Sequence, residues 1–283
     1  MHLIIKKPLD RKKCVKQIKT PVMYLPTDFG FDIPNINPNN VKIAILDTGV
    51  PTHTDIASAG KKSESACVDL LASKTSVWDE HGHSTLVTGI LAGSNPGSVM
   101  GMAPSAKYYF CKVMDDFGDG DTNNITAGII WALSHNVDII LICAGSPIHD
   151  RYLEKIVKKA VEMGCIIIVS SGKEVTRGNR TLYPACFNGV VCCSSSKEEK
   201  CTYDKNNTRL NVDVDASLKW STFPTDLYMK SSGSSIAASI VCGCVINFIG
   251  DCRMRNIAIK GVADFMEKME KTFRIDENVT NKL

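Results

Sequence analysis

The sequence contains an aspartate, a histidine and a serine whose types could together perform nucleophilic catalysis: Asp47, His83 and Ser235. A serine hydroxyl becomes a nucleophile when an imidazole removes its proton, and a carboxylate orients that imidazole. Each residue also has an ordinary structural interpretation, because strands often end in aspartate, histidines often lie in turns, and serine is a common helix N-cap. The sequence around each residue therefore decides whether a catalytic or a structural role is favoured.

Asp47 follows the apolar run 41–46 (VKIAIL) and precedes Thr48-Gly49. A carboxylate at the end of a buried strand would be held rigidly and partly desolvated. Asp-Thr-Gly also occurs in aspartic proteases, which need two such carboxylates sharing a proton. This chain has a single Asp-Thr-Gly and several segments with helical periodicity, which disfavours that class.

His83 precedes segment 84–93 (STLVTGILAG), which we predict to be a buried helix, and His81 lies two residues earlier. Ser235 follows Gly233 and opens an apolar helix, so its hydroxyl would lie where helix amides favour developing negative charge. The Gly-x-Ser-x-Ala pattern also resembles the nucleophile elbow of α/β-hydrolases. Those enzymes have the order Ser, acid, His, whereas the order here is Asp, His, Ser.

Continuously apolar runs separate these residues, as expected of parallel strands that are covered on both faces. The predicted strands are 41–46, 108–114, 137–144, 165–171 and 190–196. Segments 122–136 and 150–164 place apolar residues along one helical face. This alternation predicts an α/β fold with a mainly parallel central sheet and helices on both faces. In such sheets, active sites gather at the carboxyl ends of the strands.

The composition narrows the class of protein. The chain has 283 residues, 22% of them charged, with a net charge of +3, so we expect neither a nucleic acid nor a membrane as partner. The twelve cysteines lie mostly in apolar runs without a Cys-x-x-Cys pair, which favours buried reduced thiols over zinc ligands. Because the first residues do not read as a secretory signal, we predict a cytoplasmic location.

Three segments, in this order, resemble the signature motifs of subtilisin-like serine proteases: 41–56 (VKIAILDTGVPTHTDI), 82–93 (GHSTLVTGILAG) and 233–243 (GSSIAASIVCG). The likeness covers about residues 18–250. It implies a subtilisin-like fold and a serine endopeptidase that acts on a peptide or protein and needs no cofactor for its chemistry.

In the mechanism that this resemblance implies, Ser235 attacks the peptide carbonyl and an acyl-enzyme forms. His83 transfers the proton, and Asp47 orients the histidine. His83 rather than His81 matches the motif, because it follows Gly82 and lies six residues before the second motif glycine.

The resemblance also implies sites for substrate and metal. The residues expected to flank an extended substrate strand are Asp116, Phe117, Gly118, Cys143, Ala144 and Gly145. The small residues of the second group predict an open, uncharged pocket that accepts large apolar side chains. Asp55 and Asn95 match the region of a structural calcium ion.

The chain departs from the family at a position important for rate. The family has an asparagine that donates to the oxyanion hole, where this chain has Lys173. Lys173 could serve as a charged donor, point to solvent, or lower the pKa of His83 by repulsion. Ser84, Leu86 and Ser239-Ile240 also differ from the family pattern. A second hypothesis is therefore a pseudoprotease that binds extended peptides without cleaving them.

The domain organisation predicted from the resemblance is a short extension, residues 1–17, followed by a peptidase domain, residues 18–283. This layout resembles that of intracellular subtilisins, whose short N-terminal extension lies across the active site until it is removed. We therefore expect residues 1–17 to be inhibitory.

Overall fold

The structure is a computed structural model that describes residues 9–31, 33, 36–56, 67–71, 76–172, 181–195, 209–259, 264, 265 and 267. Its main strands are β2 (Lys42–Asp47), β3 (Cys67–Asp69), β5 (Lys107–Lys112), β6 (Ile139–Ile142), β7 (Ile166–Ser170), β8 (Val191–Ser195) and β9 (Leu210–Val214). These strands form one sheet in the order β3-β5-β2-β6-β7-β8-β9, and all neighbours pair in parallel.

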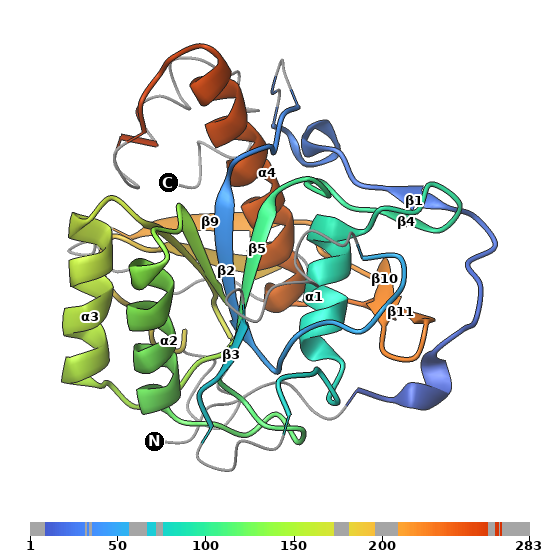
Figure 1. The fold of residues 1–283 in the computed structure, drawn as a ribbon, viewed down its shortest axis with the longest axis horizontal. Coiled ribbons are helices and arrows are strands. Elements are labelled where there is room, and N and C mark those ends of the chain that lie inside the picture. The colour runs from blue at the N-terminus through green and yellow to red at the C-terminus, as the bar shows by residue number, and fades with distance from the viewer. Residues whose placement is uncertain are drawn as a thin grey trace.

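Within the described ranges, four α-helices cover the sheet: α1 (His83–Ala92), α2 (Thr122–Ser134), α3 (Arg151–Glu162) and α4 (Ser234–Met254). Figure 1 shows α2 and α3 on one side of the sheet and α1 and α4 on the other. The predicted α/β fold with a parallel sheet and helices on both faces is confirmed.

Smaller elements surround this core. Strands β1 (Val22–Met23) and β4 (Val99–Met100) pair in parallel, and β10 (Lys219–Phe223) and β11 (Leu227–Ser231) form an antiparallel hairpin. Two short 3₁₀-helices, η1 (Arg11–Lys13) and η2 (Pro26–Phe29), lie in the N-terminal part of the chain.

The alternation of side chains along β2 explains why the predicted strands are apolar throughout. Ile43 and Ile45 join the core cluster that contains the apolar residues of α1 and α4. Ala44 and Leu46 face the opposite way, into the cluster that contains residues of α2 and α3. Because both faces are buried, every position of the strand favours an apolar residue.

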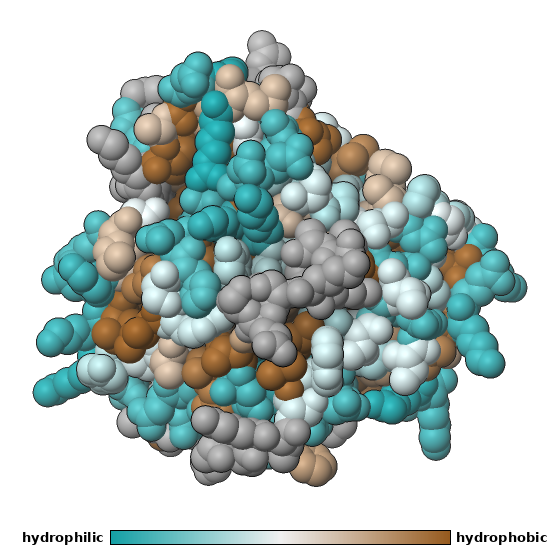
Figure 2. Space-filling model, viewed as in Figure 1, coloured by the Kyte–Doolittle hydropathy of each residue, from teal (hydrophilic) through white to brown (hydrophobic). Residues whose placement is uncertain are grey.

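Helix α4 is long, apolar and almost wholly buried. Among the described residues it is the one helix long and apolar enough to cross a membrane, but 94% of that apolar window is buried inside the fold. A core helix that contacts protein on all sides has this composition. In the view of Figure 2, hydrophilic side chains cover much of the outer rim, and hydrophobic ones are visible in the lower middle.

The carboxyl ends of β2, β6 and β7 lie side by side. The register pairs Leu46 with Ile142 and Ile142 with Val169, so the residues that follow these strands are neighbours. Helix α4 begins at this same edge, since Gly172 N, after β7, donates to Ser234 Oγ at 3.3 Å. The sheet therefore brings segments far apart in sequence to one edge.

Candidate active site

Asp47 and His83 form a buried pair at this edge. Asp47, the last residue of β2, is 1% exposed, and His83, the first residue of α1, is 6% exposed. The Nδ1 atom of His83 lies 2.8 Å from Oδ1 and 3.0 Å from Oδ2 of Asp47. A carboxylate in contact with Nδ1 keeps the proton on that nitrogen, which leaves Nε2 as the proton acceptor. This is the arrangement of a general base and its orienting group.

The surroundings of His83 raise its pKa. Burial alone would lower the pKa, but the charge of Asp47, the hydrogen bond to Asp47 and the charge of Asp79 outweigh burial, so the pKa lies above its ordinary value of 6.5. A raised folded-state pKa means that the pair stabilises the fold below the unfolded-state pKa of histidine. That stabilisation is lost as the pH rises through the folded-state pKa.

Asp79 holds the beginning of α1 in place and was missed by sequence reasoning. Its buried Oδ1 accepts hydrogen bonds from Thr48 Oγ1 at 2.7 Å and Gly82 N at 2.8 Å. Its Oδ2 accepts two further bonds, from the amide and the hydroxyl of Thr85, both at 2.6 Å. Because Thr48 follows Asp47 directly, Asp79 fixes the helix that carries His83 to the strand end that carries the carboxylate. An acidic residue just before a helix start was the available signal.

His81 lies close to this pair but in a different setting. Its ring centroid is 6.3 Å from that of His83, and its Nδ1 is buried without a hydrogen-bond partner in the described part of the chain. Burial and the proximity of His83 lower the pKa of His81. His83 is therefore the histidine that contacts Asp47.

Ser235 is the second residue of α4, so the helix begins one residue earlier than predicted. Gly233 precedes the helix with φ of 109°, a conformation that favours glycine, and Ser235 itself is partly exposed. The main-chain oxygen of Ser235 lies 3.8 Å from the Sγ of Cys143, which directly follows β6. Since β6 pairs with β2, this contact brings Ser235 to the edge that holds Asp47.

Within the described residues, no hydrogen bond joins Ser235 to His83; the hydrogen bonds of the His83 ring are with Asp47. Catalytic hydrogen bonds are often long in a protein without substrate and tighten when substrate binds. Of the three predicted residues, Asp47 and His83 are thus in direct contact, and Ser235 lies near them at the carboxyl ends of the same strands.

The predicted substrate segments lie on either side of the end of β2. Asp116, Phe117 and Gly118 belong to the loop that follows β5, whereas Cys143 to Gly145 follow β6. Asp116 pairs with the buried Lys112 at 2.6 Å. Phe117 is 83% exposed, and Gly118 lies against His81. Cys143 and Ala144 are buried.

The predicted oxyanion residue, Lys173, lies outside the described residues. Its neighbour Gly172 is described, has φ of 59° and contacts the first turn of α4 through Ser234. Two further departures, Ser84 and Leu86, are buried in α1, and the amide of Ser84 donates to Thr48 Oγ1 at 3.0 Å beside Asp47.

Asp55 and Asn95 lie together as predicted, but their contacts do not fit a calcium ion. Asn95 turns its amide nitrogen to Asp55 Oδ1 at 2.9 Å, while its own oxygen accepts from Gly97 N at 2.8 Å. The other oxygen of Asp55 accepts hydrogen bonds from Ser98 and Tyr228. Calcium binds through oxygen atoms, and these are already hydrogen-bonded.

The same hydrogen bonds perturb the pKa of Asp55. Burial alone would raise the pKa, but the bonds from Ser98, Tyr228 and Asn95 lower it further than burial raises it. In the part of the chain that the structure describes, no group of three or more His, Cys, Asp or Glu side chains could hold a metal ion. The calcium prediction from resemblance is therefore not supported by these contacts.

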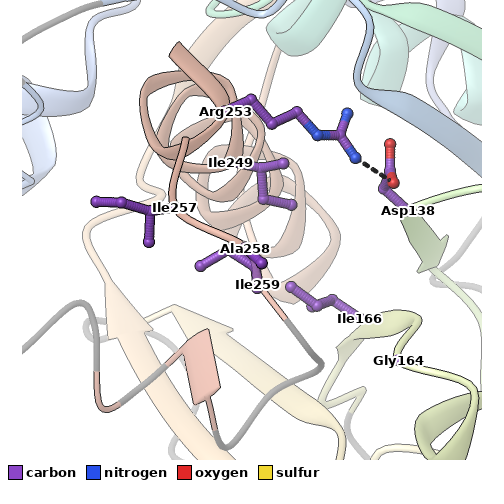
Figure 3. A pocket seen from close by; sticks show the side chains of 8 residues that line it. All are labelled: Asp138, Gly164, Ile166, Ile249, Arg253, Ile257, Ala258 and Ile259. Carbon is purple, nitrogen blue, oxygen red and sulfur yellow. Dashed lines mark hydrogen bonds and ion pairs between the residues drawn. The ribbon is translucent and has the colours of Figure 1, made fainter. Parts of the chain in front are cut away.

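A cavity of about 260 Å³ lies at the opposite edge of the sheet, near the C-terminal end of α4 (Figure 3). Half of its lining residues are isoleucines: Ile166, Ile249, Ile257 and Ile259. Its charged residues, Asp138 and Arg253, pair with each other. The cavity therefore offers no group for the chemistry considered above.

Comparisons with known proteins agree with the geometry. The model of the subtilase family matches residues 38–248. The chain is 29% identical to the minor extracellular protease Epr of Bacillus subtilis (strain 168) over 201 residues. These residues cover 70% of this chain and 30% of that protein. It is 30% identical over 236 residues to subtilisin E of the same strain, 81% of this chain and 58% of that protein.

A third relative, subtilisin of Bacillus pumilus, is 30% identical over 236 residues, with 81% of each protein covered. The chain thus spans less than two thirds of the first two relatives, and more of the third. The matched segment contains the end of β2 and the starts of α1 and α4, which carry Asp47, His83 and Ser235. With a family match over most of its length and this arrangement at the strand ends, the chain belongs to the subtilase family of serine proteases.

Proposed function

We propose that the chain is a serine endopeptidase that acts through Asp47, His83 and Ser235. The observation that carries this proposal is the buried contact of His83 Nδ1 with Asp47, at the same strand edge as a serine at a helix N-terminus. In the reaction, His83 Nε2 takes the proton of Ser235 while Oγ attacks the peptide carbonyl. The leaving amine then takes that proton, and water releases the acyl group by the reverse sequence.

Negative charge on the carbonyl oxygen needs donors in this mechanism. Ser235 lies in the first turn of α4, whose free amides and dipole favour an anion. The second donor is Lys173, which directly follows Gly172, and Gly172 itself contacts Ser234. A charged ammonium that donates to the carbonyl oxygen stabilises the oxyanion more strongly than a neutral amide does.

Lys173→Ala tests the oxyanion assignment and the proposed function together. We expect the variant to lose about 10²–10³-fold in kcat for a peptide substrate, the usual cost of one oxyanion donor. Lys158→Ala, on the exposed face of α3, is the matched control and leaves kcat unchanged. A wild-type protein that binds peptides in fluorescence polarisation but cleaves none would instead establish the pseudoprotease hypothesis.

Subtilases act on peptides or proteins, and an extended peptide is the substrate proposed here. Asp116, Phe117 and Gly118 would flank it on one side, and Cys143, Ala144 and Gly145 on the other. The main chain of both segments would pair with the substrate as an added strand. The position of the two segments on either side of the end of β2 supports this arrangement.

We also propose that residues 1–17 restrain the active site. The described part of this segment supports the idea, because Arg11 donates to the main-chain oxygen of Glu80 at 3.1 Å, just before His83. Arg11 also lies 6.0 Å from the ring centroid of Phe223, and Val15 pairs with Tyr228. The segment thus passes beside the turn that leads into α1.

Removing residues 1–16 is therefore expected to increase kcat/KM for a peptide by about tenfold or more, because a tethered segment competes at an effective concentration in the millimolar range. Steady-state hydrolysis by the full chain and by the variant beginning at Gln17 measures this. Equal rates, with equal thermal stability of the two proteins, would contradict an inhibitory role.

Chelation is expected to leave stability unchanged. Calcium at a concentration of 100 times its Kd would add about 2.7 kcal/mol to the free energy of unfolding, which is enough to raise Tm by several degrees. Because hydrogen bonds already engage Asp55 and Asn95, we expect Tm in EDTA and in excess calcium to agree within about 1 °C. A calcium-dependent rise in Tm that Asp55→Asn abolishes would restore the metal site.

We propose a cytoplasmic location, and the state of the cysteines supports it. Burial raises the pKa of the thiols of Cys111, Cys143 and Cys244, so these groups stay protonated and unreactive. Reduced buried thiols suit a reducing compartment. Fractionation of the producing cells, followed by immunodetection, tests the location directly.

A further inference from the structure

The space beside Ser235 is bordered by the ends of two strands. Cys143, after β6, contacts the main-chain oxygen of Ser235, and Gly172, after β7, contacts Ser234. The segments Cys143–Gly145 and Ser171–Gly172 therefore border the serine from the side of the sheet. A substrate residue bound at Ser235 must therefore place a side chain that points toward the sheet between these two segments.

A third segment crosses between these two and is fixed to both. Leu182 N donates to Ser171 O at 2.9 Å. Its neighbour Tyr183 exchanges two main-chain hydrogen bonds with Ser146, each of 2.8 Å. Three main-chain hydrogen bonds thus hold Leu182 between the two strand ends, and the residue is 2% exposed.

The side chain of Leu182 fills the gap between the glycines of the bordering segments. A Cβ on Gly145 would lie 2.7 Å from Leu182 Cβ and 3.3 Å from its Cδ1. A Cβ on Gly172 would lie 2.6 Å from Cδ1 and 2.9 Å from Cγ of the same leucine. The side chain of Leu182 therefore occupies the space in which a Cβ on either glycine would lie.

The residue whose carbonyl Ser235 attacks must bring its carbonyl carbon within about 3–3.5 Å of the serine oxygen. Its Cα is one bond further, so its side chain starts directly beside the bordering segments. We propose that Leu182 limits this residue of the substrate to small side chains, such as glycine, alanine and serine. The inference rests on the proposed peptidase function. It reverses the expectation of an open pocket, which was drawn from Cys143, Ala144 and Gly145 alone.

Two peptides that differ only at the residue before the scissile bond, alanine in one and phenylalanine in the other, test the inference. For the full-length protein we expect kcat/KM to be at least about tenfold higher with alanine, since a mismatch of side-chain size in a pocket changes specificity by about 10–200-fold. Leu182→Ala is expected to shift the ratio toward phenylalanine by about tenfold or more. Leu182→Gly should shift it further.

Leu133→Ala, which removes the same atoms from α2 away from Ser235, is the matched control and keeps the wild-type preference. Thermal unfolding of each variant verifies that it folds. If Leu182→Ala and Leu182→Gly do not fold, Leu182→Ile, which keeps the side-chain volume, replaces them in the comparison. A wild-type protein that cleaves the phenylalanine peptide equally well, or a Leu182→Ala ratio that does not move, would overturn the inference while peptidase function stands. Absence of cleavage together with absence of fluorophosphonate labelling would overturn both.

Discussion

Ser235→Ala is expected to lower kcat for peptide hydrolysis by about 10⁶-fold, the size of the loss caused by removing the nucleophile in the relative subtilisin. Without the hydroxyl no acyl-enzyme forms, and only the weak effects of binding and oxyanion stabilisation remain. The measurement is the initial rate of cleavage of a fluorogenic peptide at saturating concentration. Because Ser235 is partly exposed at a helix start, the variant should fold and bind substrate as before.

Ser239→Ala is the matched control for this change. Ser239 lies one turn further along α4, and its hydroxyl donates to the main-chain oxygen of Ser235 at 2.8 Å. It receives the same substitution on the same helix but has no role in the reaction, so kcat should stay within about tenfold of the wild type. Similar losses in both variants would mean that a disturbed helix, and not a missing nucleophile, explains the result.

Asp47→Asn is expected to lower kcat by about 10⁴-fold, as the same change does in other Ser-His-Asp triads. The amide can no longer hold the His83 proton on Nδ1, so the ring presents the wrong nitrogen to Ser235. The charge that raises the pKa of His83 is lost at the same time, while burial still lowers it. The pKa of His83 must therefore fall.

The pH profile separates this effect from simple misfolding. A general base must be neutral, so kcat/KM of the wild type should rise through the raised pKa of His83, above 6.5. In Asp47→Asn, the residual activity should rise at a lower pH. Asp138→Asn, at the opposite edge of the sheet, should leave both the rate and the profile unchanged. An acidic limb that does not move in Asp47→Asn would argue against control of His83 by Asp47.

The sheet and its helices could be predicted from sequence because burial on both faces makes each strand continuously apolar. Strands β6, β7 and β8 lie inside predicted apolar segments, and β2 and β5 overlap theirs and extend one residue beyond. The hairpin of β10 and β11 was not predicted, because its alternating pattern is short and half exposed. The end of helix α4 at Met254 was not predicted, because its last turn includes the charged residues Asp251 and Arg253.

The site could be predicted only in part, for a physical reason. Asp47, His83 and Ser235 each stand next to a strong local signal, a strand end or a helix start. Leu182 has no such signal, because its effect depends on two glycines, Gly145 and Gly172, that only the folded chain brings to it. Asp55 shows the same limit, since the hydrogen bond from Tyr228 comes from a residue 173 positions away.

Labelling with a fluorophosphonate, followed by intact mass measurement and peptide mapping, tests the central claim most directly. The reagent reacts with a serine only where a base removes its proton and donors stabilise the resulting anion. We predict one equivalent of label on Ser235 in the variant beginning at Gln17 and none in the same variant with Ser235→Ala. A folded variant beginning at Gln17 that takes up no label, or takes it up on another residue, would contradict the assignment of Asp47, His83 and Ser235 as a working catalytic triad.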